Sequence, residues 1–271
     1  MAEPGLDEQI DLQAAADRIG VHYQTAYRWV RSGKLPAHLI DGSYRIDPTD
    51  LDALEARRRT PSARRPPSGD RLRRQSQRLY DALVAGDETS VRRITSRLLD
   101  EGTPIVDLIQ DVIVPPLRDI GAAWHSGQLS IWVEHRASAI VERVLGEVAP
   151  NPRGRRRGRA VVAAVSGDLH SLPTTMAAVA LRDDNWHVDH FGADMPQEEL
   201  LDYCASNVVD VVVLSSTNPD TASLAESTAV ELGARGTAAI VGAPGSTLLR
   251  LRAEAREIAA RAGTELVVTA R

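Results

Sequence analysis

Two stretches rich in arginine and proline constrain the fold of this 271-residue chain more than any other feature. They cover residues 57–69 and 149–158. Because proline lacks a backbone donor and clashes with the preceding helical turn, neither stretch can be helical throughout. We predict two solvated linkers, with a basic nucleic-acid arm as the alternative interpretation of each. The linkers divide the chain into three segments, residues 1–56, 70–148 and 159–271.

The composition narrows the class of protein further. A net charge of -5 excludes a surface that is basic all over, but it permits a local DNA-binding patch. The single cysteine, Cys204, excludes an internal disulfide framework and a cysteine-rich zinc site. No apolar run approaches the roughly 20 residues that a membrane span needs, and the N-terminus lacks a signal-peptide pattern. We therefore expect a cytoplasmic protein that does not contact membranes.

The first segment has the pattern of a winged helix-turn-helix. Asp11 is placed to cap a first helix with apolar residues at helical spacing, which Gly20 ends. A second short helix is predicted within residues 22–33. Asp41-Gly42 marks a hairpin between short extended runs, and Pro48 begins a closing helix.

The same segment carries the predicted DNA-binding residues. Between Arg18 and Arg45 the only acidic residue is Asp41, and Trp29 is expected to pack against the first helix. The alternative is a small helical module that binds protein. The segment resembles the winged helix-turn-helix of MerR-type and excisionase-like regulators over residues 9–56, which implies double-stranded operator DNA as a partner. Side chains suited to bases and phosphates form the predicted set: Gln24, Thr25, Tyr27, Arg28, Arg31, Lys34, Tyr44 and Arg45.

The middle and last segments differ in their apolar period. Residues 70–148 contain four stretches with a 3.6-residue period, separated by glycine-containing turns, which predicts a four-helix bundle. The last segment alternates short apolar runs with amphipathic helices near 174–184, 196–207, 220–235 and 247–262, as in a flavodoxin-like parallel α/β domain that binds ligands at its strand C-termini. The predicted strands are RAVVAAV, WHVDHFG, VVDVVVLSS, TAAIVGA and TELVVTA.

A histidine follows the first of these strands, two residues after an aspartate. His170 could act as a metal ligand or a base, and Asp168 could hold its tautomer, although an isolated Asp-x-His is more often a polar loop. The last segment resembles the cobalamin-binding domain of methionine synthase and related corrinoid proteins. The resemblance implies that His170 is the lower cobalt ligand, with Asp168 as its partner. It also implies that Ser215 and Gly242 line the pocket for the benzimidazole tail.

Three positions depart from the family pattern of this domain. Pro173 stands in place of the loop glycine, Thr217 in place of a leucine, and Ala243 in place of the second glycine. Alanine leaves most of the room that glycine gives a ligand, and proline is acceptable in the first turn of a helix. Pro173 could nevertheless crowd the tail or reposition His170.

The bundle contains a spaced motif, Trp124 followed ten positions later by Glu134-His135. A helical hairpin could bring the three residues to one rim of the bundle. The alternative places Trp124 and Trp132 in the bundle core and leaves Glu134 and His135 as a surface pair. The remaining candidate ligands lack a partner pattern: His125, His187, His190 and Cys204.

The order of the three segments and the Trp-x9-Glu-His motif resemble the CarH group, the light-sensing MerR-type repressors that depend on adenosylcobalamin. The resemblance implies a non-enzymatic repressor that binds its operator as a dark tetramer. Trp124 and Glu134 would pack over the adenosyl group, and His135 would take the upper cobalt position after light breaks the cobalt–carbon bond. Two alternatives remain: a regulator of the same architecture with another ligand or none, and a corrinoid carrier in methyl transfer.

Overall fold

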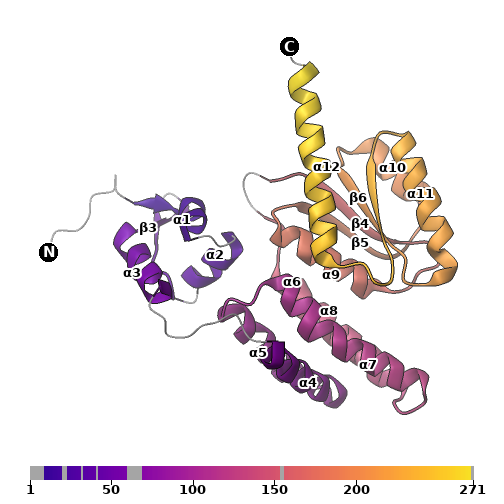
Figure 1. Cartoon of the computed structure of the whole chain (residues 1–271), viewed down its shortest axis with the longest axis horizontal. Coiled ribbons are helices and arrows are strands. Elements are labelled where there is room, and N and C mark those ends of the chain that lie inside the picture. The colour runs from indigo at the N-terminus through magenta and orange to yellow at the C-terminus, as the bar shows by residue number, and fades with distance from the viewer. Residues whose placement is uncertain are drawn as a thin grey trace. The chain divides into compact units, whose positions relative to one another are not determined.

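The protein is described here by a computed structural model, which divides into two units, Met1–Pro67 and Ser68–Arg271 (Figure 1). Among the residues that the structure describes, no helix is both long and apolar enough to cross a membrane. The described residues are 9–19, 23–31, 33–40, 42–59, 69–152 and 156–269, without the side chains of residues 24, 25, 28, 55–59 and 262–269.

The first unit is a winged helix-turn-helix, as predicted. The carboxylate of Asp11 accepts a hydrogen bond from Ala14 N at 2.7 Å and caps the first helix. The hairpin turn contains Gly42 with a φ of +76°, a conformation that glycine adopts without strain. The elements are β1 (Ile10–Asp11), α1 (Leu12–Ile19), α2 (Tyr23–Arg31), β2 (His38–Ile40), β3 (Ser43–Ile46) and α3 (Pro48–Arg59).

Two details of this unit refine the sequence analysis. The antiparallel sheet has the order β1-β3-β2, so a short strand before the first helix joins the predicted hairpin. Helix α3 continues to Arg59, three residues into the predicted linker of residues 57–69. A proline disfavours the helical conformation of the residue before it, and Pro61 follows the end of helix α3 at Arg59 closely.

The second unit begins with the predicted four-helix bundle. Its turns contain Gly86, Gly102 and Gly127, all with positive φ. The third helix is not continuous, because Pro115 and Pro116 supply no N–H to the helical ladder and a π-helix precedes them. The elements are α4 (Gly69–Ala85), α5 (Glu88–Asp100), α6 (Ile105–Asp107), the π-helix Leu108–Ile113, α7 (Val114–His125) and α8 (Ile131–Val148).

The second unit ends with a parallel α/β domain of the predicted kind. The sheet has the order β5-β4-β6-β7, which leaves β5 as an edge strand. The strands are β4 (Arg159–Val165), β5 (His187–Met195), β6 (Val211–Ser215) and β7 (Ala238–Gly242). The helices are α9 (Ser171–Asp183), α10 (Gln197–Ser206), the 3₁₀ turn Pro219–Thr221, α11 (Ala222–Ala234) and α12 (Leu248–Thr269).

One predicted strand is wrong. The run TELVVTA was expected to form a fifth strand, but residues 264–269 continue helix α12. Its β-branched residues favour a strand only weakly, whereas each residue added to an existing helix gains a hydrogen bond without a new nucleation step.

One hydrophobic cluster extends from the bundle into the α/β domain. Met176, Val179 and Ala180 of α9 are buried among the apolar side chains of the bundle. A hydrogen bond of 3.3 Å from Thr175 Oγ1 to Glu142 Oε1 joins α9 to α8 across the same interface. Helix α9, which begins directly after His170, is therefore the element that connects the bundle to the sheet (Figure 1).

Candidate cofactor and DNA-binding sites

The loop that follows β4 holds its aspartate inside the protein. Asp168 is 0% exposed, and its carboxylate accepts hydrogen bonds from His170 Nδ1 at 2.7 Å and from Asn218 N at 3.2 Å. It also accepts from the backbone N–H groups of His170 and Thr217. Burial by itself raises the pKa of Asp168, but these hydrogen bonds outweigh it and hold the pKa below its ordinary value. The carboxylate is therefore ionised at neutral pH.

This contact determines which nitrogen of His170 is free. An ionised carboxylate only accepts hydrogen bonds, so the Nδ1 atom of His170 carries the hydrogen. In the neutral imidazole the Nε2 atom then keeps its lone pair, which is the requirement for a metal ligand. The His170 side chain is 59% exposed, so this nitrogen is accessible from outside the domain.

Strands β6 and β7 end at the same carboxyl-terminal side of the sheet as β4, whose following loop carries this histidine. Ser215 pairs in register with Gly242 where β6 and β7 end, at the edge of the sheet to which the Asp168 loop also belongs. A Cβ atom added to Gly242 would meet only Leu214 O at 3.7 Å, an ordinary van der Waals distance. Packing within the protein does not require glycine at this position, and the backbone there is open to close approach.

The three residues that depart from the family pattern fit the local fold. Helix α9 has His170 as its N-cap residue, so Pro173 lies in the first turn, where its missing N–H is not needed. The backbone N–H of Thr217 binds the Asp168 carboxylate. Ala243 is exposed.

The bundle carries a second histidine–carboxylate pair at the start of α8. His135 Nδ1 lies 2.6 Å from Glu134 Oε2, and Ser138 Oγ donates to Glu134 Oε1 at 2.7 Å. The His135 side chain is 70% exposed. Trp124, at the end of α7, is 41% exposed, and Trp132 is 59% exposed. The alternative that placed both tryptophans in the bundle core is therefore wrong.

Four of the predicted cofactor residues form two separate pairs. One contains Asp168 and His170, and the other contains Glu134 and His135. Within the described part of the chain, no hydrogen bond or ring contact joins the two pairs or joins either of them to Trp124. The sequence analysis did not consider Asp194, which contacts the Asp168 loop. The signal available for it was a polar residue shortly before Pro196 at the end of a predicted strand.

The predicted DNA-binding residues are partly described. Tyr27 stacks with Tyr23 at 6.4 Å and meets Tyr44 edge-on at 5.9 Å, so the second helix contacts the wing. Trp29 is buried against the first helix, as expected, and the Lys34 ammonium lies 4.3 Å from its ring centroid. Two predicted residues are exposed, Arg31 and Arg45. Three have side chains outside the described residues: Gln24, Thr25 and Arg28.

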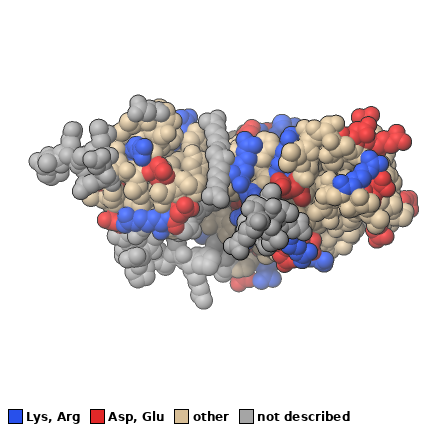
Figure 2. Space-filling model, turned by 90° about the horizontal axis from the view of Figure 1, so that it is seen from above, with Lys and Arg blue, Asp and Glu red and all other residues tan. Residues whose placement is uncertain are grey.

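Charged side chains of both signs are visible on one face of the molecule, among a larger area of other residues (Figure 2). On the face shown in Figure 2, Lys and Arg residues lie interspersed with Asp and Glu residues. This mixture agrees with the net charge of -5 and with a DNA-binding surface that is local.

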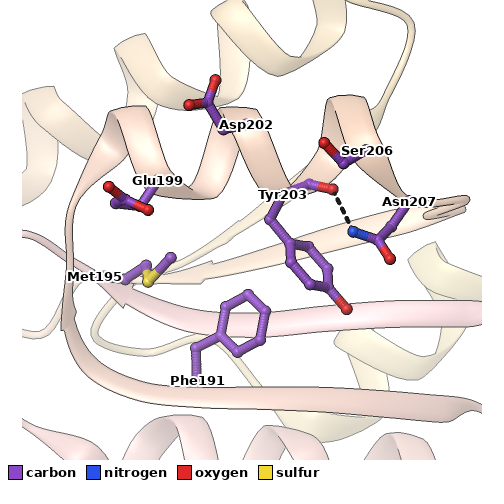
Figure 3. Close-up of a pocket in the computed structure, with 7 residues that line it drawn as sticks. All are labelled: Phe191, Met195, Glu199, Asp202, Tyr203, Ser206 and Asn207. Carbon is purple, nitrogen blue, oxygen red and sulfur yellow. Dashed lines mark hydrogen bonds between the residues drawn. The ribbon is translucent and has the colours of Figure 1, made fainter.

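A hollow between the edge strand β5 and helix α10 contains none of the predicted site residues. Figure 3 shows Phe191 and Met195 of β5 on one side and residues of α10 on the other. The rings of Phe191 and Tyr203 meet edge-on at 4.8 Å, and Asn207 Nδ2 donates to Tyr203 O at 2.9 Å. The ring contact joins β5 to α10 at one side of the hollow.

Comparisons with known proteins agree with this arrangement. Residues 10–59 match a family model described as a helix-turn-helix domain. Residues 75–148 and 158–268 match two models that are each described as a B12 binding domain. The Methanosarcina barkeri monomethylamine corrinoid protein shares the fold, with a TM-score of 0.52 and 17% identity over 67% of this chain and 95% of that chain.

Two curated relatives come from Myxococcus xanthus. The HTH-type transcriptional repressor CarA is 31% identical over 166 residues, which cover 58% of this chain and 52% of CarA. The HTH-type transcriptional repressor CarH is 29% identical over 124 residues, which cover 44% of this chain and 41% of CarH. The chain thus spans about half the length of the relatives it matches.

These matches define a helix-turn-helix protein with B12-binding domains. Within that class, the similarity to CarA and CarH confirms the resemblance to CarH-type regulators. Both relatives are repressors rather than enzymes, which agrees with the expectation that this chain is not an enzyme.

Proposed function

We propose that this protein is a cytoplasmic, light-responsive transcriptional repressor that binds operator DNA in the dark with adenosylcobalamin and leaves it after illumination. The observation that carries the proposal is the Asp168–His170 pair, which presents a free Nε2 atom at the ligand-binding edge of a parallel sheet. The room beside Gly242 supports it, because a ligand tail can approach the backbone there.

Each residue of the site has a role in the proposal. His170 is the lower cobalt ligand, and Asp168 fixes its tautomer and orientation. When bound, adenosylcobalamin supplies a cobalt–carbon bond that light can break. Trp124 and Glu134 cover the adenosyl group in the dark. His135, whose side chain is 70% exposed, would supply a second imidazole to the cobalt in the illuminated state.

In the proposal, the helix-turn-helix units couple the state of the cofactor to DNA binding. A change in the group under the bundle alters contacts at the bundle surface, which biases assembly of a homo-oligomer, in our proposal a tetramer in the dark. Linked units bind neighbouring operator sites with a high effective concentration, so loss of assembly lowers DNA affinity. Arg31 and Arg45 are exposed and would contribute phosphate contacts.

The experiment that tests the proposal uses purified protein and adenosylcobalamin. The protein is incubated with the cofactor in darkness and desalted, and visible spectra are recorded before and after green illumination. We expect the protein to retain the cofactor and its visible spectrum to shift on illumination. In the variant His135→Ala, this spectral shift of the photoproduct should be lost. Operator binding is then measured in both states, with release expected after illumination.

Other results would favour the alternatives. Retention without a light response would favour a regulator of the same architecture with altered sensing. Absence of retention would contradict the cofactor assignment and leave a regulator with another ligand. Absence of operator binding in both states would favour a corrinoid carrier in methyl transfer.

A further inference from the structure

Asp194 has an unusual backbone conformation at the end of β5. Its φ is +54°, and Asn185 is the only other non-glycine residue with positive φ among the described residues. The pairing of β5 with β4 shifts register after Val162, and Gly192 in this region has a φ of +77°. Such irregularities at strand ends redirect the following side chains. Residues other than glycine rarely adopt a positive φ unless surrounding contacts hold them there.

Asp194 forms three hydrogen bonds with the loop that precedes His170. Its Oδ1 atom accepts hydrogen bonds from Gly167 N at 2.8 Å and from Ser166 Oγ at 3.4 Å. Its own backbone N–H donates to Asp168 O at 3.0 Å. Asp194 therefore binds three consecutive residues of the loop, through both its side chain and its backbone.

The loop is held from a second side as well, because the backbone N–H groups of Thr217 and Asn218 bind the Asp168 carboxylate. Asp168 N donates to Val165 O at 3.0 Å and closes a tight turn in which Gly167 has a φ of +85°. Within this turn the Gly167 N–H points to the Asp194 carboxylate. Without that acceptor, the Gly167 N–H loses its partner, and the turn keeps the backbone hydrogen bond from Asp194 N to Asp168 O as its tie to β5. The peptide that precedes Asp168 is then less restrained.

We propose that Asp194 is a positioning residue, which fixes the turn so that Asp168 presents His170 to cobalt. The inference rests on the proposed role of His170 as the lower ligand. Asp194 does not touch the metal in this arrangement and acts through Gly167 and Asp168. Its positive φ is the conformation that lets backbone and carboxylate reach the loop together.

The test uses the full chain loaded with cob(II)alamin after labelling of its histidines with ¹⁵N. In the electron paramagnetic resonance spectrum, a ¹⁵N-histidine ligand splits the cobalt lines into doublets, and the ¹⁴N of benzimidazole gives triplets. Asp194→Gly keeps the backbone free to adopt positive φ and removes the carboxylate. Asp194→Asn keeps an acceptor oxygen and tolerates positive φ. Asn185→Gly is the matched control, because it changes the other positive-φ residue, in the turn before β5.

The wild type, Asp194→Asn and Asn185→Gly are expected to show doublets. Asp194→Gly is expected to lose most of the doublet signal and to bind cob(II)alamin about tenfold more weakly, the lower end of the effect of removing an outer-shell partner. In the cofactor-free protein, the Gly167 amide should exchange with solvent faster in Asp194→Gly than in the wild type. This second measurement reports the hydrogen bond without any cofactor.

The possible failures are distinguishable. If the wild type shows no doublets, the proposed role of His170 is wrong, whatever the variants do. If the wild type shows doublets and Asp194→Gly shows them to the same extent, the positioning role is wrong. If Asn185→Gly loses them as well, the effect comes from general destabilisation, and the positioning role is again contradicted.

Discussion

The two histidine–carboxylate pairs of this protein look alike in their bonds but differ in how their carboxylates are held. Asp168 is fully buried and accepts hydrogen bonds from the backbone of a second loop, at Thr217 and Asn218. Glu134 is 26% exposed and is held by Ser138, a residue of the same helix. The first pair is fixed by tertiary structure, whereas the second depends on one turn of α8.

This difference matches two kinds of ligand. A permanent ligand gains from a position that is fixed before the metal arrives, because no ordering cost remains at binding. A conditional ligand must change its partner when the state of the cofactor changes, and an exposed side chain on a helix surface has that freedom. The roles proposed for His170 and His135, which the family resemblance implies, agree with this contrast.

The largest expected effect comes from Asp168→Asn. The amide has one acceptor oxygen, so it cannot serve the donors of His170, Thr217 and Asn218 together. We expect the affinity for adenosylcobalamin in darkness to fall by about 10-fold to 100-fold. Glu134→Gln, the matched change in the bundle, should alter it by less than about threefold, or about 0.65 kcal/mol. Absorbance titrations measure both values, and equal losses would remove the contrast between the pairs.

A second prediction concerns the space beside the fixed pair. Gly242→Val adds side-chain atoms where the protein itself has room, since the nearest atom to a new Cβ is Leu214 O at 3.7 Å. We expect thermal unfolding of the cofactor-free protein to change little and cobalamin binding to weaken by about tenfold, equivalent to about 1.4 kcal/mol. Ala243→Gly serves as the control and should change neither quantity. A large loss of stability in Gly242→Val would show that glycine serves the fold there.

The sequence predicted these sites unevenly, and the reasons are physical. The buried strand β4 and the turn after it follow from a continuous apolar run and from Gly167, so the position of His170 could be predicted closely. The acceptor role of Asp194 could not, because it depends on the register shift between β5 and β4. Such a contact arises between residues distant in sequence and has no local pattern.

Two other features show the same limit. The Trp-x9-Glu-His spacing did not reveal whether Trp124 is buried, since the answer depends on how α7 ends against its neighbours. The run at residues 264–269 favoured a strand by composition but continues α12. Local propensity predicts an element best where burial on both faces or a turn residue restricts the choice.

A third prediction concerns pH and the helices that carry the conditional pair. Hydrogen bonds from Arg143 of α8 and Arg92 of α5 lower the pKa of Glu88 to about 2, from an ordinary value of 4.5. A lowered pKa in the folded state stabilises the bundle fully above about pH 4.5, and this contribution is lost as the pH falls towards 2. Glu88→Gln should therefore reduce the difference in unfolding midpoint between pH 6 and pH 3. An unchanged difference would mean that other carboxylates carry the acid sensitivity.

The smallest expected effect separates the two exposed tryptophans of the bundle. Arg136 lies 5.0 Å from the ring centroid of Trp132 and donates to Val84 O, so Trp132 covers a contact between α8 and α4. Trp132→Ala should lower the free energy of unfolding by about 0.5–1 kcal/mol, the value of an exposed cation–π contact, and leave cofactor retention unchanged. Trp124→Ala should leave the free energy of unfolding nearly unchanged and reduce cofactor retention, because its proposed role is to cover the adenosyl group. Denaturant unfolding and dark retention after desalting measure the two quantities. Loss of cofactor retention in Trp132→Ala would mean that Trp132, which lies outside the Trp-x9-Glu-His motif, also takes part in holding the cofactor.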